Sequence, residues 1–584
     1  MKKGKNIRNI KRNNLIQFFS VVGIILALNI IFSYVFVRID LTSEKRYTLS
    51  KSTRAMVKNI DDIVYVSVYL YGKNLPPDFS ELSLKTREFL DELRVYSKNI
   101  HYEFIDPTEN KDEQQLMAFY GQLYKQGLQP QPIQDVDASG VNTRYIVPGA
   151  IIRYRQRETP VQLLDSDEGI LYNRNDIIKF SIDKLEYNIT NAIRRLTGQQ
   201  KATVAFLKGH GELTNREVFS AAVGIADFYA VDSVVFDNKI SKIFDIELVD
   251  SNTVDFVIKG NKYDLLVIAK PTQAFSNYEK YILDQYVMRG GKILWYVDPV
   301  FAEMDSLQYY KEVPCLPRDL NLEDLFFRYG VRLNSNLLQD LNALPIPVKS
   351  GEIAGQAQYK FIPWYFFPLI TPVADHPIVK NLNVLKTEFV SSMDTVGTKS
   401  GLTKTVLLTT SASTKILNTP AIISLEALKR RAINREYAHK YIPVSVLVEG
   451  VFTSLFSGYD KMVDQEKIGF IEKSKPTKLI FVSDGDMIKN QFSSKGYPLP
   501  LGYDQYTDVA YGNKNFLLNA VNYLCDDEDI VQVRSKDFKM RLLDKDKILK
   551  EKTFWQVLNM VLPLCFVIIM GIIFVVIRKR KFAR

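Results

Sequence analysis

The sequence is poor in the residues that bind metals and carry out nucleophilic catalysis. Its 584 residues include three cysteines and four histidines. The cysteines form no Cys-x-x-Cys pair and the histidines stand singly along the chain, so we expect neither a zinc site nor disulfide-exchange chemistry. Cys315 and Cys525 could form a disulfide, but nothing in their spacing demands one.

Motifs of nucleotide hydrolysis and acyl transfer are also missing. A phosphate-binding loop needs the pattern Gly-x-x-x-x-Gly-Lys-Ser/Thr, and the nearest stretch, residues 397–405, lacks both the spacing and the Gly-Lys pair. No Gly-x-Ser-x-Gly occurs, and the expected strand ends near Gly209, Pro271 and Pro299 carry no cysteine nucleophile. We therefore expect no enzymatic activity, no cofactor and no bound metal.

A net excess of positive charge is found only at the two ends of the chain. The formal net charge is +10, but six basic residues lie within positions 1–14 and five within 578–584, with no acidic residue in either stretch. The intervening chain is nearly neutral, which argues against a basic groove for nucleic acid. A composition of 46% hydrophobic and 24% charged residues is typical of folded protein. At about 150 residues per domain, the length predicts three or four domains, or two large ones.

Each basic end adjoins a long uncharged apolar run. Residues 15–37 and 554–577 are long enough, at about 1.5 Å per residue, to span the ~30 Å hydrocarbon core as helices. A cleaved signal peptide is the alternative for the first run, but the run is too long and lacks a small-x-small cleavage site. A core helix is the alternative for the second, but a basic cluster follows it directly. The positive-inside rule then places both basic tails in the cytoplasm and residues 38–553 on the other side.

Both runs contain polar or helix-bending residues that a helix facing only lipid rarely carries. Such positions are candidates for contacts with the membrane helices of a partner, or between the two helices themselves. They are Asn29 in the first run and Gln556, Asn559 and Pro563 in the second.

The first part of the ectodomain, residues 41–198, has the pattern of a small α/β domain. Ser50 is expected to cap a short helix over residues 51–59. The expected order is then strand, helix, strand, helix, hairpin and closing helix, over residues 63–71, 80–97, 101–105, 111–127, 145–155 with 159–164, and 182–196. This is the order of a thioredoxin-like fold that lacks the redox cysteine pair.

The second part, residues 199–530, alternates strands and helices as a doubly wound parallel sheet does. The expected strands are residues 202–207, 234–235, 263–269, 292–297 and 479–483, with 404–410 and 443–450 extending the same sheet. The expected helices begin near Asn215, after the cap residue Ser276 and at Phe516. An insertion covers about residues 301–475, and residues 531–553 link this domain to the second membrane helix.

Two stretches of the insertion have more than one interpretation. The aromatic run at residues 361–367 could be a partner surface, but such runs are more often core, and we expect core here. Residues 424–439 carry several basic side chains and are expected to form a charged, solvated helix, with a partner contact as the alternative.

Short motifs along the chain, most of them in the second part, carry a family resemblance. The stretches at 47–50, 209–212 and 290–299 fit it but are short, whereas the block around the last strand is more specific. That block consists of residues 482–486 with Asn490, 500–504, 511–513, 516–519, 534–536 and 541–544. Together these motifs resemble the gliding-motility ABC-transporter auxiliary protein of the GldG type, and the resemblance covers nearly the whole chain.

The resemblance implies a fold, a location and partners. The ectodomain would have a glutamine-amidotransferase-like α/β fold and would be a substrate-binding-type, non-catalytic component. Its partners would be a separate polytopic permease and a cytoplasmic ATPase, in a system of Bacteroidota tied to gliding and its secretion pathway. The protein would cross the inner membrane twice, with the ectodomain in the periplasm; self-association is left open. The alternative is an independent periplasmic binding or scaffold protein tethered by its two helices.

Several acidic residues and one histidine follow the expected strands. They are His210, Glu212, Asp298, Asp484 and Asp486. In open parallel sheets ligands collect at the carboxyl ends of the strands, so these side chains are candidates for a ligand crevice, and converging carboxylates could hold a divalent cation. The alternative, which we favour, is that they cap helices and form turns.

Overall fold

The structure, a computed structural model, describes residues 15–24, 49–525 and 545–582 apart from internal gaps. The gaps are positions 73–74, 110, 138–139, 165–173, 198–201, 238, 251–254, 354–355, 381, 398–400, 426–427, 429–433 and 459–468. The chain divides into two units, residues 1–536 and 537–584.

The small α/β domain has the predicted elements in the predicted order, with an additional hairpin before β5 and an additional helix, α5, before the closing helix. Its sheet has the order β2-β1-β5-β6, in which β1 pairs with β2 in parallel and β5 is antiparallel to both of its neighbours. The strands are β1 (Val64–Val68), β2 (Ile100–Phe104), β5 (Gly149–Tyr154) and β6 (Arg157–Gln162). The helices are α2 (Lys51–Lys58), α3 (Pro77–Tyr96), α4 (Glu113–Lys125), α5 (Arg174–Asp183) and α6 (Leu185–Thr197).

The cap of α2 was predicted in this domain, whereas a second hairpin was not. Ser50 accepts a hydrogen bond from the Thr53 amide, so the predicted cap of α2 is confirmed. A second hairpin, β3 (Gln131–Asp137) with β4 (Gly140–Ile146), was not predicted. The first of its strands lacks the β-branched alternation that identifies a strand, whereas Val141, Thr143 and Tyr145 in the second alternate with polar residues and were a signal that the sequence analysis missed.

A seven-stranded sheet forms the centre of the second part. Its order is β21-β24-β25-β12-β11-β7-β8; the five strands from β25 to β8 are parallel, and β24 and β21 are antiparallel. The strands are β7 (Thr203–Lys208), β8 (Ala230–Val235), β11 (Leu265–Ala269), β12 (Lys292–Tyr296), β21 (Thr403–Thr409), β24 (Pro443–Gly450) and β25 (Thr477–Val482). The predicted strands and both predicted extensions are confirmed. Both sheet faces are buried, which explains the continuous apolar strand sequences.

Helices cover both faces of this sheet. α7 (Phe219–Ala226) and α12 (Asn513–Cys525) pack into one hydrophobic core, and α8 (Asn277–Met288) and α10 (Glu323–Arg328) into the other. Ser276 caps α8 as predicted, in a reciprocal capping box with Glu279. α7 begins four residues later than the predicted Asn215, because the amide and hydroxyl of Thr214 bond the Glu217 carboxylate in a local turn.

The insertion contributes small sheets beside the central one. Its elements are β13 (Val300–Phe301), β14 (Glu312–Pro317), β15 (Val331–Leu333), β16 (Asn336–Asp340), β17 (Ala343–Ile353), β18 (Gln356–Ile370), β19 (Leu385–Lys386), β20 (Met393–Thr395), β22 (Thr414–Asn418), β23 (Ala421–Ser424), α9 (Met304–Tyr309) and a 3-10 turn at Asn434–Glu436. Elsewhere in the second part lie the hairpins β9 (Phe244–Asp250) with β10 (Asp255–Asn261) and β26 (Tyr503–Asp504) with β27 (Val509–Ala510), and 3-10 turns at Ile240–Lys242 and Asp486–Ile488.

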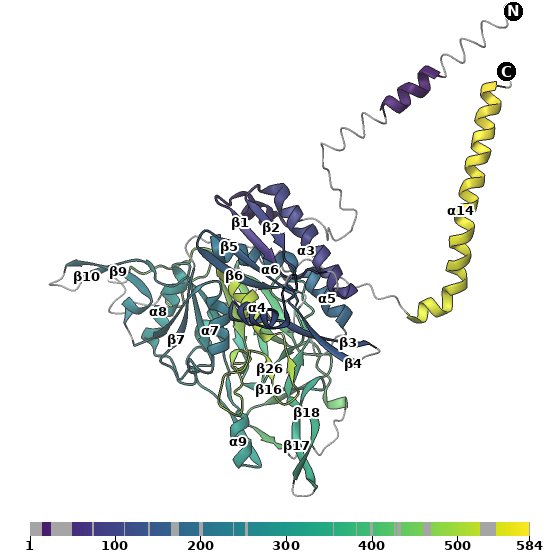
Figure 1. Ribbon diagram of the computed structural model, residues 1–584. Helices are drawn as coiled ribbons and strands as arrows, with labels where there is room; N and C mark the ends of the chain where they lie inside the picture. The colour runs from purple at the N-terminus through teal and green to yellow at the C-terminus, as the bar shows by residue number, and fades with distance from the viewer. Residues whose placement is uncertain are drawn as a thin grey trace, which may run out of the picture. The chain divides into compact units, whose positions relative to one another are not determined.

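The two ambiguous stretches of the insertion have different outcomes. The aromatic run lies in β18, where Trp364, Phe366 and Phe367 are buried, so the prediction of core is confirmed for these three residues. Phe361 is 48% exposed and pairs with Pro347 in the β17–β18 hairpin, which Figure 1 shows below the central sheet. The single helix predicted over 424–439 is wrong where this stretch is described. Ser424 ends a strand that pairs with β14, and Asn434–Glu436 is only a 3-10 turn.

The C-terminal unit contains one long helix, α14 (Lys545–Phe582), drawn in yellow in Figure 1. Its stretch Met560–Arg580 is the one helix of the described residues that is long and apolar enough to cross a membrane. The helix begins at Lys545, so the last part of the predicted linker, up to residue 553, is helical and continuous with the apolar stretch. The first predicted span is described only at Leu15–Ile24, a short apolar helix, and Asn29 lies outside the described residues.

Candidate functional site

The predicted site residues lie at the carboxyl edge of the central sheet, around its topological switch point. The chain runs from β7 to β8 in one direction and from β11 through β12 to β25 in the other, so the strand order reverses between β7 and β11. His210 and Glu212 follow β7, whereas Asp298 follows β12 and Asp484 and Asp486 follow β25. This edge is where doubly wound sheets hold their ligands.

Three of the five residues form one cluster around a lysine. Lys270, directly after β11, places its Nζ 2.5 Å from Asp486 Oδ2 and 3.3 Å from Asp298 Oδ2. Lys270 and Asp298 are each 5% exposed and Asp484 is fully buried. Gly485 is required by this close packing, because a Cβ there would lie 2.6 Å from Lys270 Cγ and 3.1 Å from Asp298 Oδ1.

Asp484 holds the turn that follows β25. Its carboxylate accepts backbone N–H bonds from Asp486 at 2.8 Å, from Met487 at 3.1 Å and from Glu388 at 2.8 Å. The first two are the bonds of an aspartate that caps a turn, and the third ties this turn to the inserted lobe. The Asp298 carboxylate, in turn, accepts the Gly485 N–H at 2.5 Å.

Burial and mutual charge set the protonation of this cluster. Burial raises the pKa of Asp484 well above its ordinary value, and the neighbouring Asp298 and Asp486 carboxylates raise it further. Burial also raises the pKa of Asp298, against the opposing effect of Lys270. For Lys270, burial alone would lower the pKa, but the Asp298 and Asp486 carboxylates outweigh it and raise the pKa. Lys270 is therefore held as a cation at neutral pH.

His210 and Glu212 belong to a second, separate group that includes Glu279 of α8. His210 Nδ1 lies 3.4 Å from Glu212 Oε1 and its Nε2 lies 3.2 Å from Glu279 Oε2. The imidazole stacks on Phe275 with ring centroids 3.7 Å apart. Burial alone would lower the pKa of His210, but the two glutamates outweigh it and raise the pKa. The loop needs glycine at 211, where φ is +70° and a Cβ would lie 2.1 Å from Thr272 Oγ1.

The structure adds residues that the sequence analysis missed. Lys270 could have been found by the same rule as the acids, because it stands between a strand and Pro271. Glu279 had a signal as the third residue of the α8 capping box. No signal in the sequence indicated Glu388, because this residue belongs to the insertion.

The two groups find most of their partners within themselves, although His210 Nδ1 and Glu212 Oε1 are buried without a hydrogen bond to any described residue. Every charge in the two groups faces an opposite charge or backbone amides, and no group of three or more His, Cys, Asp or Glu residues suited to a metal occurs in the described chain. The three cysteines are free, so the disulfide left open between Cys315 and Cys525 is not formed. Burial raises the pKa of the Cys315 thiol to about 11, which keeps it protonated. Ligand binding at this edge stays a prediction.

Comparison with known proteins gives matches to both parts of the chain. The model of a family described as an ABC-type uncharacterized transport system matches residues 201–520, and a domain of unknown function, DUF7088, matches residues 43–153. An uncharacterized protein of Borreliella burgdorferi is 21% identical over 582 residues, covering 96% of this chain and 98% of its own.

Solved structures resemble the chain only distantly. The N-terminal domain of mmIFT52 is 14% identical with a TM-score of 0.32, covering 56% of this chain and 99% of that one. A protein described as ThuA-like from Parabacteroides merdae is 12% identical with a TM-score of 0.24, covering 56% of this chain and 90% of that one. Scores this low carry no argument about function.

Proposed function

Because the chain belongs to the ABC-type uncharacterized transport system family, as an auxiliary component, we propose that it is a non-catalytic, membrane-anchored exoplasmic subunit that couples to a separate permease and ATPase. The observation that carries the proposal is the family match over residues 201–520 in a chain whose α14 is long and apolar enough to cross a membrane. The motifs around β25 add the finer proposal that the system is of the gliding-motility GldG type and serves the associated secretion pathway.

The absence of catalysis is supported by the chemistry of the sheet edge. The Lys270 amine is held as a cation and cannot act as a nucleophile or base near neutral pH. Cys315 is buried and its thiol stays protonated. In this proposal the glutamine-amidotransferase-like domain and the thioredoxin-like domain are both retained as binding scaffolds, without the reactive cysteines of those folds.

The topology part of the proposal is a two-pass protein of the bacterial inner membrane with a periplasmic ectodomain. The basic cluster at residues 578–581 directly follows the apolar stretch of α14, as in a helix whose C-terminal end is cytoplasmic. The apolar sequence of residues 15–37 supports a second crossing.

Co-purification of the full chain from detergent-solubilised membranes tests the coupling. We expect a polytopic permease and an ATPase to co-purify, and we expect the pair Gln556→Leu and Asn559→Leu to reduce their yield. These two positions are three residues apart and share one helix face. The matched control is Val557→Leu with Val561→Leu, exposed positions on a different face of α14, which should leave the yield unchanged.

Each outcome of this experiment separates the two interpretations of the helices. Loss of both partners in the polar-face variant, with the control unaffected, supports an ABC-complex subunit. Purification of the wild-type chain without any polytopic protein contradicts that proposal and favours the alternative, an independent periplasmic binding or scaffold protein that uses its helices only as tethers.

A further inference from the structure

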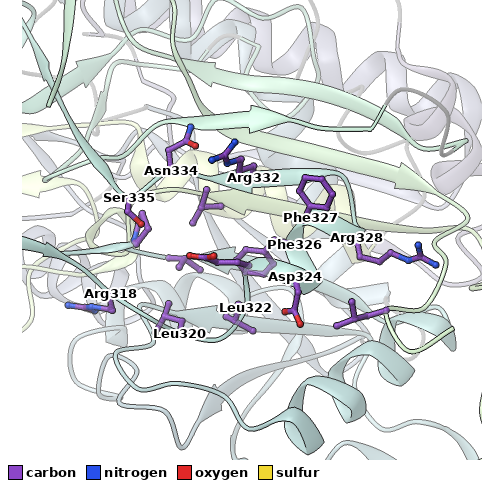
Figure 2. A pocket seen from close by; sticks show the side chains of 15 residues that line it. Arg318, Leu320, Leu322, Asp324, Phe326, Phe327, Arg328, Arg332, Asn334 and Ser335 are labelled. Atoms are coloured by element: carbon purple, nitrogen blue, oxygen red, sulfur yellow. The ribbon is translucent and has the colours of Figure 1, made fainter. Parts of the chain in front are cut away.

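A cavity of about 700 Å³ lies beside the sheet edge and is separate from the two ionic groups described above. Its walls come from the segment after β12, from α10 and the loop before it, and from β15 and the residues that follow. Figure 2 shows Arg332, Asn334 and Ser335 on one side and Leu320 and Leu322 on the other, with Phe326 between them. The volume is in the range of sites for small organic ligands.

The deep surface of the cavity is apolar. Val297, Leu320, Leu322 and Phe326 line it, and each is no more than 5% exposed. These residues belong to the same hydrophobic core as the central sheet, so the floor is held by packing and does not depend on a ligand. Such a floor would desolvate the apolar body of a bound molecule.

The polar residues of the cavity include two arginines with unused hydrogen-bonding capacity. Arg332 is exposed and has no hydrogen-bond or ion-pair partner within the described part of the chain. Arg318 is 5% exposed; its guanidinium lies over the Phe301 ring at 4.5 Å and its Nη1 makes a long 3.4 Å bond to the Pro271 carbonyl, but its buried Nε has no hydrogen-bond partner among the described residues. An arginine has five donors, and leaving them unpaired in a buried position is costly. Both side chains are suited to a carboxylate or phosphate.

The acidic residues of the rim do not cancel this positive charge. Asp324 is already neutralised by the buried Lys280, whose Nζ lies 2.7 Å from its Oδ2. Arg328 adds a third cation, whose Nε donates to the Ser454 carbonyl at 3.1 Å. Glu323 is the remaining acid of the lining and is exposed. The cavity is thus apolar inside and cationic at its polar wall.

We propose that this cavity binds a small organic anion, with an apolar body against Leu320, Leu322 and Phe326 and a carboxylate or phosphate head group bound by Arg332. The shared chemistry is an anionic head on an apolar body, and a carboxylate metabolite and a phosphate ester are the two sources that a test can separate. The proposal goes beyond the transport role and does not depend on it, because it rests only on the lining of this cavity.

Equilibrium dialysis of the full chain in lipid nanodiscs tests the proposal. The ligands are 2-naphthylacetate, 2-naphthyl phosphate and the uncharged 2-naphthylacetamide, with acetate as a competitor that has a head group but no apolar body. We expect saturable binding of at least one naphthyl anion. The amide should bind at least about tenfold more weakly than this anion, and acetate should displace the anion only at concentrations at least about tenfold above the Kd of the anion. The tighter of the two naphthyl anions identifies the head group.

Variants at exposed arginines connect the binding to this cavity. Arg332→Gln removes the exposed, unpartnered guanidinium without disturbing the core, and we expect the Kd of the preferred anion to rise about tenfold or more. Arg94→Gln, on the exposed face of α3, is the matched control and should leave the Kd unchanged. All variants are measured in identical nanodiscs, so partition of the ligand into lipid is the same in each measurement.

Three results would overturn the proposal. They are the absence of saturable binding for both anions, equal binding of the anion and the amide, and a Kd that Arg332→Gln leaves unchanged. None of these results bears on co-purification with a permease, so failure here and failure of the proposed transport role are distinguishable.

Discussion

At the scale of single residues, Asp484 combines two roles that sequence patterns treat separately. It caps the turn after β25 through two backbone amides, and it accepts a third amide, that of Glu388, from the insertion. It is fully buried beside Asp298 and Asp486, so burial and like charge work against its ionised form, and backbone donors stabilise it. The residue is therefore a structural link between the sheet and the insertion.

We expect Asp484→Ala to destabilise the local structure by about 2–4 kcal/mol, because a lost cap costs about 0.5–2 kcal/mol and the orphaned Glu388 amide adds to it. Hydrogen exchange of peptides covering residues 482–490 and 386–392 measures this, in the presence and absence of calcium or magnesium. Asp319→Ala is the control, since Asp319 forms an exposed turn bond with Asn321. A metal-dependent protection that disappears in Asp484→Ala would contradict the capping role and indicate a cation site.

His210 makes the stability of the sheet edge depend on pH, and the direction of this dependence follows from its pKa. Its pKa is raised above the ordinary 6.5, so its stabilising contribution is complete below that pH and is lost as the pH rises through the raised value. Burial alone would raise the pKa of Glu279, but the hydrogen bonds from Ser276 and the charge of His210 outweigh it and lower the pKa. The contribution of Glu279 to stability is therefore present above the ordinary 4.5 and is lost at lower pH. Both contributions are therefore present together between these two values.

The prediction concerns His210→Gln. We expect the difference in free energy of unfolding between wild type and this variant to be larger near pH 6 than near pH 9. Urea unfolding, monitored through hydrogen exchange of peptides from β7 and α8, measures this difference. His439→Gln, at an exposed position, should show no such trend. A difference that grows toward alkaline pH would mean that His210 is neutral between its two glutamates.

At the scale of secondary-structure elements, α8 depends on one buried carboxylate. Every residue from Glu279 to Met288 is buried, and Asp284 is fully buried within this stretch. Its carboxylate accepts hydrogen bonds from the Ser454 hydroxyl at 2.6 Å, the Tyr329 hydroxyl at 2.9 Å and the Leu455 amide at 3.0 Å. The helix is thereby bound to the chain that follows β24.

We expect Asp284→Ala to lower the free energy of unfolding by about 3–5 kcal/mol, because the Ser454, Tyr329, Leu455 and Gln285 donors all lose an acceptor inside the protein. Asp237→Ala, which removes an exposed partner of Lys239, should change it far less. Hydrogen exchange of central-sheet peptides in increasing urea measures both. A small effect of Asp284→Ala would mean that water replaces the carboxylate at this position.

At the scale of the whole molecule, an ectodomain of neutral charge lies between two apolar runs with basic ends. α14 is 38 residues long, about 57 Å at 1.5 Å per residue, so it exceeds the ~30 Å hydrocarbon core and its polar start at Lys545 can project from the membrane. In the proposed topology, the first turns of α14 would therefore lie on the exoplasmic side of the membrane.

The topology prediction follows from the two basic ends. Protease added to spheroplasts should digest the region 41–553 and leave epitope tags at both termini intact. A variant in which the basic residues at 578–581 are replaced by glutamine is the matched test of the positive-inside rule and should weaken protection of the C-terminal tag. A body protected from protease in the wild-type chain would overturn the topology.

The absence of catalysis is the second prediction at this scale. The purified chain should neither hydrolyse ATP nor release ammonia from glutamine, because its sequence has no phosphate-binding loop and no cysteine at an expected strand-to-helix turn. Turnover above that of a mock purification would contradict the proposal. If the turnover survived Cys315→Ala with Cys525→Ala, the active site would lie elsewhere in the chain.

The sequence by itself determined the secondary elements whose signal is local. The buried parallel strands were evident as continuous apolar runs, Ser50 and Ser276 as caps, and α14 as an apolar run followed by basic residues. Helix 424–439 was wrong because its basic side chains resemble a solvated helix face, whereas its first residue belongs to a strand that pairs with β14, more than a hundred positions earlier. Local periodicity contains no information about such a partner.

Only the tertiary structure decided which strand-end side chains meet. The strand order places Lys270 against Asp486, 216 positions away, and leaves His210 and Glu212 in a separate group with Glu279. The cavity lined by Arg318 and Arg332 likewise exists only because the segment after β12, α10 and β15 come together. The physical reason is the same in each case. A cap or an apolar run acts over a few residues, whereas buried ion pairs and cavities depend on strand order and on an insertion whose path local patterns do not specify.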